Sequence, residues 1–153
     1  MPSIQTSYTP QLAIAFAGMV ADMRNRTVLS YTSQSPGPTP YGSVVMRGTS
    51  DNGCLNIGDP GAGAFLGIAI LDPTIRPQVG AVTNAYGPTD IAAVLIKGIV
   101  WVTVGSPVTA GAPAYYTPAG VITSVGAGNT AIPMASFESS APSGSIAKLR
   151  IIA

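Results

Sequence analysis

The chain has no histidine, and its 153 residues include one cysteine, seven basic and six acidic side chains. General acid–base catalysis, metal ligation and activated nucleophiles draw mainly on His, Asp, Glu, Lys and Cys. A chain so poor in these groups is expected neither to be an enzyme nor to hold a metal or cofactor. Cys54 has no partner for an internal disulfide and no histidine to activate it, so we interpret it as a small buried hydrophobic residue. The composition favours a structural protein.

Charged residues make up only 8% of the chain, whereas hydrophobic residues make up 46%. Typical soluble domains carry about 25% charged residues, so much of this surface must be neutral or apolar. Large exposed apolar patches mark interaction sites, and a surface with little charge protects poorly against association. We therefore expect the protein to form oligomers or to dock on a larger assembly.

The few charges give a net charge of +1 and form no block of one sign. This disfavours nucleic-acid binding, and we interpret Arg24 and Arg26, with Asp22 beside them, as a solvated turn. The longest apolar stretch, residues 91–104, is interrupted by a lysine and a glycine and falls short of the ~20 residues of a membrane helix. Residues 1–5 lack the pattern of a secretory signal. We therefore expect neither a membrane span nor secretion.

Eighteen glycines and fourteen prolines fall between short apolar runs, a pattern typical of strands separated by turns. Residues 91–97 and 99–104 predict two strands around a bend or bulge at Lys97-Gly98, at the centre of the sheet. Further strands are predicted at residues 42–48, 65–71, 114–117, 121–124, 131–137 and 146–152. The sequence thus predicts a mainly β fold, either a compact antiparallel β-barrel or a jelly-roll-like β-sandwich.

The N-terminal residues have a different pattern. Residues 33–40 carry three prolines at alternate positions, which excludes a regular helix and predicts a polyproline-like linker. Residues 11–23 are compatible with a short helix or with extended chain, and we expect an extended arm. We therefore divide the chain into an arm and linker, residues 1–40, and a β domain, residues 41–153. The arm would either lie on a neighbouring molecule or pack on its own barrel. Its apolar side chains form a stripe that comprises Leu12, Ile14, Phe16 and Met19.

Aromatic side chains offer a second kind of surface. In a strand, Trp101 shares a face with Ile99 and Thr103, which is typical of a core or interface residue. Tyr115 and Tyr116 point to opposite faces of a strand, so one of them should be available to a partner. An exposed aromatic platform would suit a carbohydrate- or host-surface-binding module, which is the alternative function.

Four segments carry a resemblance to a known family. They are residues 15–22 (AFAGMVAD), 41–48 (YGSVVMRG), 98–102 (GIVWV) and 108–115 (VTAGAPAY). Together they span most of the chain in order, and they resemble the structural cement, or decoration, proteins of tailed bacteriophage heads. None of them carries a catalytic signature.

The resemblance implies that the protein functions by adhesion. Such proteins sit on the outer face of an assembled icosahedral shell as small oligomers, here a dimer or trimer, and bridge neighbouring major capsid protein subunits. It also implies synthesis in the host bacterial cytoplasm and incorporation into the virion, with neither nucleic acid nor membrane as a partner. The residues expected to contact the capsid are Leu12, Ile14, Phe16 and Met19, with Tyr115 or Tyr116 as a further exposed contact.

Overall fold

The computed structural model describes residues 15–72 and 84–152, and every regular element in these two ranges is a β-strand. Short turns rich in glycine and proline separate the strands, as the sequence predicts. The strands are β1 (Val20–Ser33), β2 (Thr39–Pro40), β3 (Val44–Arg47), β4 (Gly53–Asn56), β5 (Phe65–Ala69), β6 (Ala85–Tyr86), β7 (Ile91–Thr103), β8 (Pro113–Tyr116), β9 (Ile122–Thr123), β10 (Thr130–Phe137) and β11 (Ile146–Ile151). The predicted mainly β, antiparallel class is confirmed.

Nine of the strands form one sheet in the order β1-β4-β3-β5-β7-β11-β10-β8-β9. β1 also pairs with β7, so β1, β4, β3, β5 and β7 close into a ring. Within this ring only β1 and β4 run parallel. A separate pair, β2 with β6, completes the described strands. Closure of the ring leaves these five strands without a free edge, where backbone N–H and C=O groups would otherwise be unpaired.

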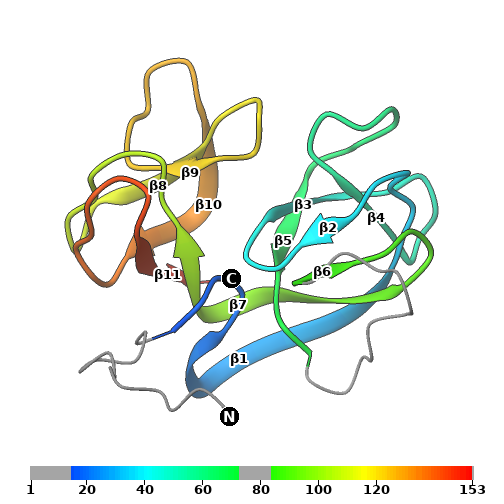
Figure 1. Ribbon diagram of the computed structural model, residues 1–153, viewed down its shortest axis with the longest axis horizontal. Helices are drawn as coiled ribbons and strands as arrows, with labels where there is room; N and C mark the ends of the chain where they lie inside the picture. The colour runs from blue at the N-terminus through cyan, green and yellow to red at the C-terminus, as the bar shows by residue number, and fades with distance from the viewer. Residues whose placement is uncertain (1–14, 73–83, 153) are drawn as a thin grey trace, which may run out of the picture.

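The remaining strands of the sheet form a second lobe on the other half of β7. β11 pairs with β7 from Gly98 to Thr103, and β10, β8 and β9 follow in order. A parallel bridge between Val104 and Ile122 brings β9 back beside the end of β7. Figure 1 shows β1 and β7 running along one side of the molecule, with β2–β6 at one end and β8–β11 at the other. β7 is therefore the shared strand of two lobes.

The predicted bend lies at Gly98, although the two predicted strands are one continuous strand, β7. Gly98 has a φ of 134°, a conformation that L side chains rarely adopt. At this point β7 changes its neighbour on one side from β5, where Ile68 faces Leu95, to β11, where Ile151 faces Gly98. The bend thus lets one strand serve both lobes.

One hydrophobic core extends through both lobes. Alternate residues of β7 and β11 point inward, and Val100, Val102 and Leu149 are completely buried. Each such side chain contributes roughly 1.5–3 kcal/mol relative to an exposed one. The lobes also meet through Phe65 and Tyr116, whose stacked rings have centroids 6.1 Å apart. The two lobes therefore pack as one unit.

The sheet begins earlier in the chain than the sequence analysis placed the β domain. Val20–Ser33 forms β1, whose ladder with β7 extends from Val20 opposite Val100 to Thr32 opposite Ile91. Residues 20–33 of the predicted arm and linker therefore belong to the sheet. The proline-rich stretch that follows is also held to the domain, because the backbone amide of Asn56 on β4 donates to the Ser35 hydroxyl at 2.7 Å and its side-chain amide donates to the Pro38 carbonyl at 3.0 Å.

Candidate functional site

In the two described ranges, no group of three or more His, Cys, Asp or Glu side chains is placed to hold a metal ion. Cys54 is buried, as predicted, and burial raises the pKa of its thiol to about 11. At neutral pH this thiol is protonated and therefore a poor nucleophile. The same residues include no helix that is long and apolar enough to span a membrane. The candidate sites of this molecule are its surfaces.

Residues 15–19 are anchored near the C-terminal end of β7, at Trp101. The Gly18 amide donates to the Trp101 carbonyl, and the Trp101 amide donates to the Met19 carbonyl, both at 2.8 Å. The Leu71 amide donates to the Gly18 carbonyl, also at 2.8 Å. Gly18 has a φ of 89°, and a Cβ at this position would lie 2.5 Å from the Cβ of Tyr41. Glycine is therefore required for this part of the chain to lie so close to its own domain.

Two residues of the predicted stripe lie in this anchored segment. Phe16 is 46% exposed, and Met19 is half-buried. Leu12 and Ile14 lie outside the described residues. The Phe16 groove has a volume of about 340 Å³ and is lined by Phe16, Ala17, Pro38, Pro40, Tyr41, Asn84 and Ala85. Most of this lining is apolar, which makes the groove suited to a hydrophobic contact.

The two adjacent tyrosines face opposite sides of β8, as the alternation predicts. Tyr116 is buried against Phe65, whereas Tyr115 is half-buried and lines a surface groove. This Met134 groove has a volume of about 390 Å³ and is lined by Pro113, Ala114, Tyr115, Ala131, Ile132, Met134, Ala135, Ser136 and Ile152. Of the tyrosine pair, Tyr115 alone is positioned to reach a partner.

Met134 is the most conspicuous residue of that groove. Its side chain is 69% exposed, and its backbone has a φ of 51°, an unfavourable region for a bulky residue. Its carbonyl accepts a hydrogen bond from the Ile152 amide at 3.0 Å, and Ile152 is itself 41% exposed. Backbone strain of this kind costs about 1–3 kcal/mol and concentrates at functional sites. The ladder of β10 with β8 is irregular between Ala131 and Ser136, and Met134 lies in this bulge. No local sequence pattern therefore indicates that Met134 is exposed.

Trp101 does not form an open aromatic platform. It faces Lys148 across the ladder of β7 and β11, and the Lys148 ammonium lies 5.2 Å from the centroid of the indole ring. The indole is half-buried, and the ammonium is attracted to the face of its π system. This agrees with the expectation of a core or interface residue.

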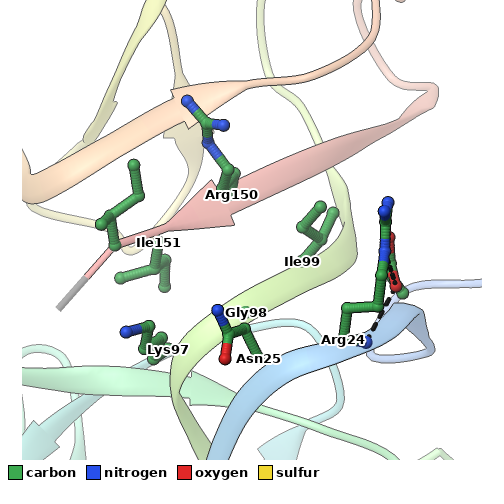
Figure 2. Close-up of a pocket in the computed structure, with 9 residues that line it drawn as sticks. Arg24, Asn25, Lys97, Gly98, Ile99, Arg150 and Ile151 are labelled. Carbon is green, nitrogen blue, oxygen red and sulfur yellow. Dashed lines mark hydrogen bonds and ion pairs between the residues drawn. The ribbon is translucent and has the colours of Figure 1, made fainter.

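A cationic cleft lies where β1, β7 and β11 meet (Figure 2). Its volume is about 390 Å³, and its lining residues are Asp22, Arg24, Asn25, Lys97, Gly98, Ile99, Arg150, Ile151 and Ile152. Arg24 forms a salt bridge with Asp22 at 2.7 Å, and its guanidinium and backbone amide donate hydrogen bonds to the Asp22 carboxylate. These hydrogen bonds lower the pKa of the Asp22 carboxyl to about 2. Sequence reasoning missed this cleft, because its cations stand at positions 24, 97 and 150, far apart along the chain.

With these surfaces described, comparison with known proteins becomes informative. A model of the family described as "Structural cement protein (E217 gp24/Pam3 gp6)" matches residues 4–152. The chain belongs to this phage family. It is thus a phage structural cement protein and not an enzyme. The resemblance noted in the sequence is confirmed.

Solved structures support the fold of the cement protein. A chain from "The capsid of Myoviridae Phage XM1" is 17% identical with a TM-score of 0.72, and the match covers 97% of each chain. A chain from "The crystal structure of head fiber gp8.5 N base in bacteriophage phi29" is 15% identical with a TM-score of 0.48. That match covers 82% of the cement protein and 95% of the phi29 chain, and its score is too low to support an argument. No curated protein matches the sequence.

Proposed function

We propose that this protein binds the outer surface of the phage capsid and stabilises the shell by bridging neighbouring major capsid protein subunits. The main supporting observation is that it carries two apolar grooves on different parts of the molecule. The Phe16 groove lies beside β2 and β6, the Met134 groove lies on β8 and β10, and they share no lining residue. Two separate contacts are what a bridging protein requires.

The first contact involves the N-terminal arm. In this proposal Leu12, Ile14, Phe16 and Met19 dock on one capsid subunit, and the hydrogen bonds of Gly18 hold the base of the arm on β7. The remaining residues of the chain, from β1 onward, supply the rigid body from which the arm reaches its partner. Anchoring the base reduces the conformational entropy that the arm loses on binding.

The second contact is centred on Met134 and Ile152. Complete burial of a Met or Ile side chain contributes about 1.5–3 kcal/mol. Scaled by exposures of 69% and 41%, the two side chains together would contribute roughly 2–3 kcal/mol per copy before ordering costs. Once one groove is bound, the second contact is effectively intramolecular, so modest contacts produce a strong clamp.

Cosedimentation with shells assembled from the major capsid protein alone tests this proposal. We expect the intact chain to pellet with shells, and deletion of residues 1–14 to weaken binding while leaving the Gly18 anchor intact. Met134→Asn should also weaken binding, because it removes the apolar contact. Asparagine tolerates a positive φ, so the backbone of β10 should be unchanged. Val125→Ser is the matched control, since Val125 is 48% exposed and lines neither groove. Failure of the intact chain to bind shells would contradict the proposal.

We further propose that the protein acts as a dimer or trimer on the shell. The basis is its low charge, which leaves much of its surface apolar or neutral. Counting the copies that contact one another at each site of the shell, in a reconstruction of the particle, tests this proposal. Two or three mutually contacting copies are expected, and isolated single copies would contradict it.

A further inference from the structure

The ladder between β1 and β7 is interrupted by a large bulge. Asp22 faces Ile99 and Thr27 faces Lys97, so five residue steps along β1 correspond to two along β7. The residues between them, 23–26, are all exposed, and Asn25 has a φ of 49°. Bulges reorient side chains, and they are frequent beside functional sites. Here the bulge places Arg24 and Asn25 on the wall of the cationic cleft.

The cations of the cleft remain at least partly exposed. Glu138 forms an ion pair with Arg150 through Nε, at 2.9 Å, and the Arg150 side chain stays 45% exposed. Lys97 forms no ion pair with any residue in the described ranges. Three cations and one carboxylate line the cleft, so the lining has a net charge of +2. The cleft therefore favours an anionic ligand.

The same cleft has an apolar component. Ile99 and Ile152 contribute apolar side chains to its lining, and Figure 2 shows Ile99 beside the charged side chains. Ile152 also lines the Met134 groove, so the two surfaces adjoin at this residue. A ligand that matches both components carries carboxylates next to apolar side chains.

We propose that the cationic cleft binds an acidic segment of another polypeptide, whose carboxylates pair with Lys97 and Arg150. Arginine binds carboxylates with two parallel hydrogen bonds, and an unpaired lysine gains a partner without breaking an existing pair. A single-stranded nucleic acid is a poorer match, because such ligands need aromatic side chains for base stacking and none lines this cleft. If the segment belongs to the capsid protein, the inference rests on the proposed function.

Binding can be measured on the full chain without shells. We would titrate the ¹⁵N-labelled protein with a hexaglutamate peptide at low ionic strength, and with hexaglutamine and an oligothymidylate in parallel. We expect hexaglutamate to shift the amides of residues 22–26, 97–99 and 150–152, and added salt to weaken the effect. Lack of shifts in these residues, or equal binding of oligothymidylate or hexaglutamine there, would overturn the proposal.

Charge-removing variants assign the effect to the cleft. Lys97→Gln should weaken hexaglutamate binding about threefold, and Lys97→Gln with Arg150→Gln about tenfold, with a smaller salt dependence. Arg47→Gln is the matched control, because Arg47 is an exposed arginine on β3, outside the cleft. Since Lys97 makes no ion pair with the part of the chain that the structure describes, its single variant tests the idea even where the double variant is unstable. Equal affinities for Lys97→Gln and Arg47→Gln would refute the assignment.

Shell binding by the same variants separates this inference from the proposed function. We expect Lys97→Gln to weaken shell binding while Arg47→Gln leaves it unchanged. Shell binding that is unaffected by Lys97→Gln would overturn the cleft as a capsid contact and leave the proposed function intact. Failure of the intact chain to bind shells, with hexaglutamate still bound in the cleft, would overturn the proposed function alone.

Discussion

Replacing Gly18 by alanine tests whether the anchor of the N-terminal segment depends on a close backbone approach. The added Cβ would lie 2.5 Å from the Cβ of Tyr41 and 3.0 Å from the Gly42 amide nitrogen. Carbon atoms in contact are normally about 3.5–4.0 Å apart, so the two segments must separate. The substitution also places an alanine at a φ of 89°, which costs about 1–2 kcal/mol.

The loss of stability cannot exceed the free energy needed to detach residues 15–19 from the domain. Once this segment is detached, the added Cβ no longer clashes with Tyr41 and the backbone at position 18 is no longer strained. Release breaks the three backbone hydrogen bonds that join Gly18 and Met19 to Trp101 and Leu71. At about 1 kcal/mol net for each bond, Gly18→Ala should lower the free energy of unfolding by about 3 kcal/mol. For a chain of this size the melting temperature should fall by roughly 6–12 °C.

Urea unfolding followed by tryptophan fluorescence measures this effect, because Trp101 is the single tryptophan of the chain. Its backbone accepts one of these hydrogen bonds and donates another. Gly111→Ala is the control: Gly111 has a φ of 87°, but a Cβ there would meet no atom within 4 Å. That variant should lose only about 1–2 kcal/mol. Equal losses for the two variants would refute the close-approach argument.

Three further predictions concern titratable groups. Carbon NMR should show the Asp22 carboxyl titrating with a pKa of about 2, against an ordinary value of 3.8. Its ion pair with Arg24 should therefore be fully formed above pH 3.8 and be lost as the pH falls through 2. Arg24→Ala should restore the ordinary pKa. Cys54 is buried, with its pKa raised to about 11, so a thiol reagent at neutral pH should label it only after unfolding, and rapid labelling of the folded protein would contradict this. Burial raises the pKa of the Tyr86 hydroxyl to about 12. Its contribution to stability should therefore be complete below pH 10 and decrease by about 2 kcal/mol by pH 12, and urea titrations of Tyr86→Phe should lack this decrease.

The sequence predicts the strands whose side chains alternate cleanly. β11 reads as Ile146, Lys148 and Arg150 against Ala147, Leu149 and Ile151, and the structure buries the second set. The bend at Gly98 is also predictable, because a glycine interrupts a long apolar run. These features depend on local periodicity, which the sequence displays directly.

β1 could not be predicted in the same way. Its sequence contains three charged residues in its first half, and the bulge at residues 23–26 breaks the alternation on which strand prediction depends. Its pairing is decided by β7, about seventy residues later in the chain. Tertiary pairing here overrides a weak local signal.

The candidate surfaces were predictable only in part. Alternation predicts that one of Tyr115 and Tyr116 points outward, without saying which, and Phe16 belongs to an apolar stripe whose role stays a prediction. Met134 is exposed by a bulge, and the cleft gathers Lys97 and Arg150 from different strands. Both features arise from the three-dimensional arrangement, so no spacing in the sequence indicates them.

The most direct test of the central claim is a cryo-electron microscopy reconstruction of the phage head that contains this protein. We predict density for the chain on the outer face of the shell, with the Phe16 groove and the Met134 groove contacting two neighbouring capsid subunits. A reconstruction in which both grooves face solvent, or in which each copy contacts a single subunit, would contradict the account.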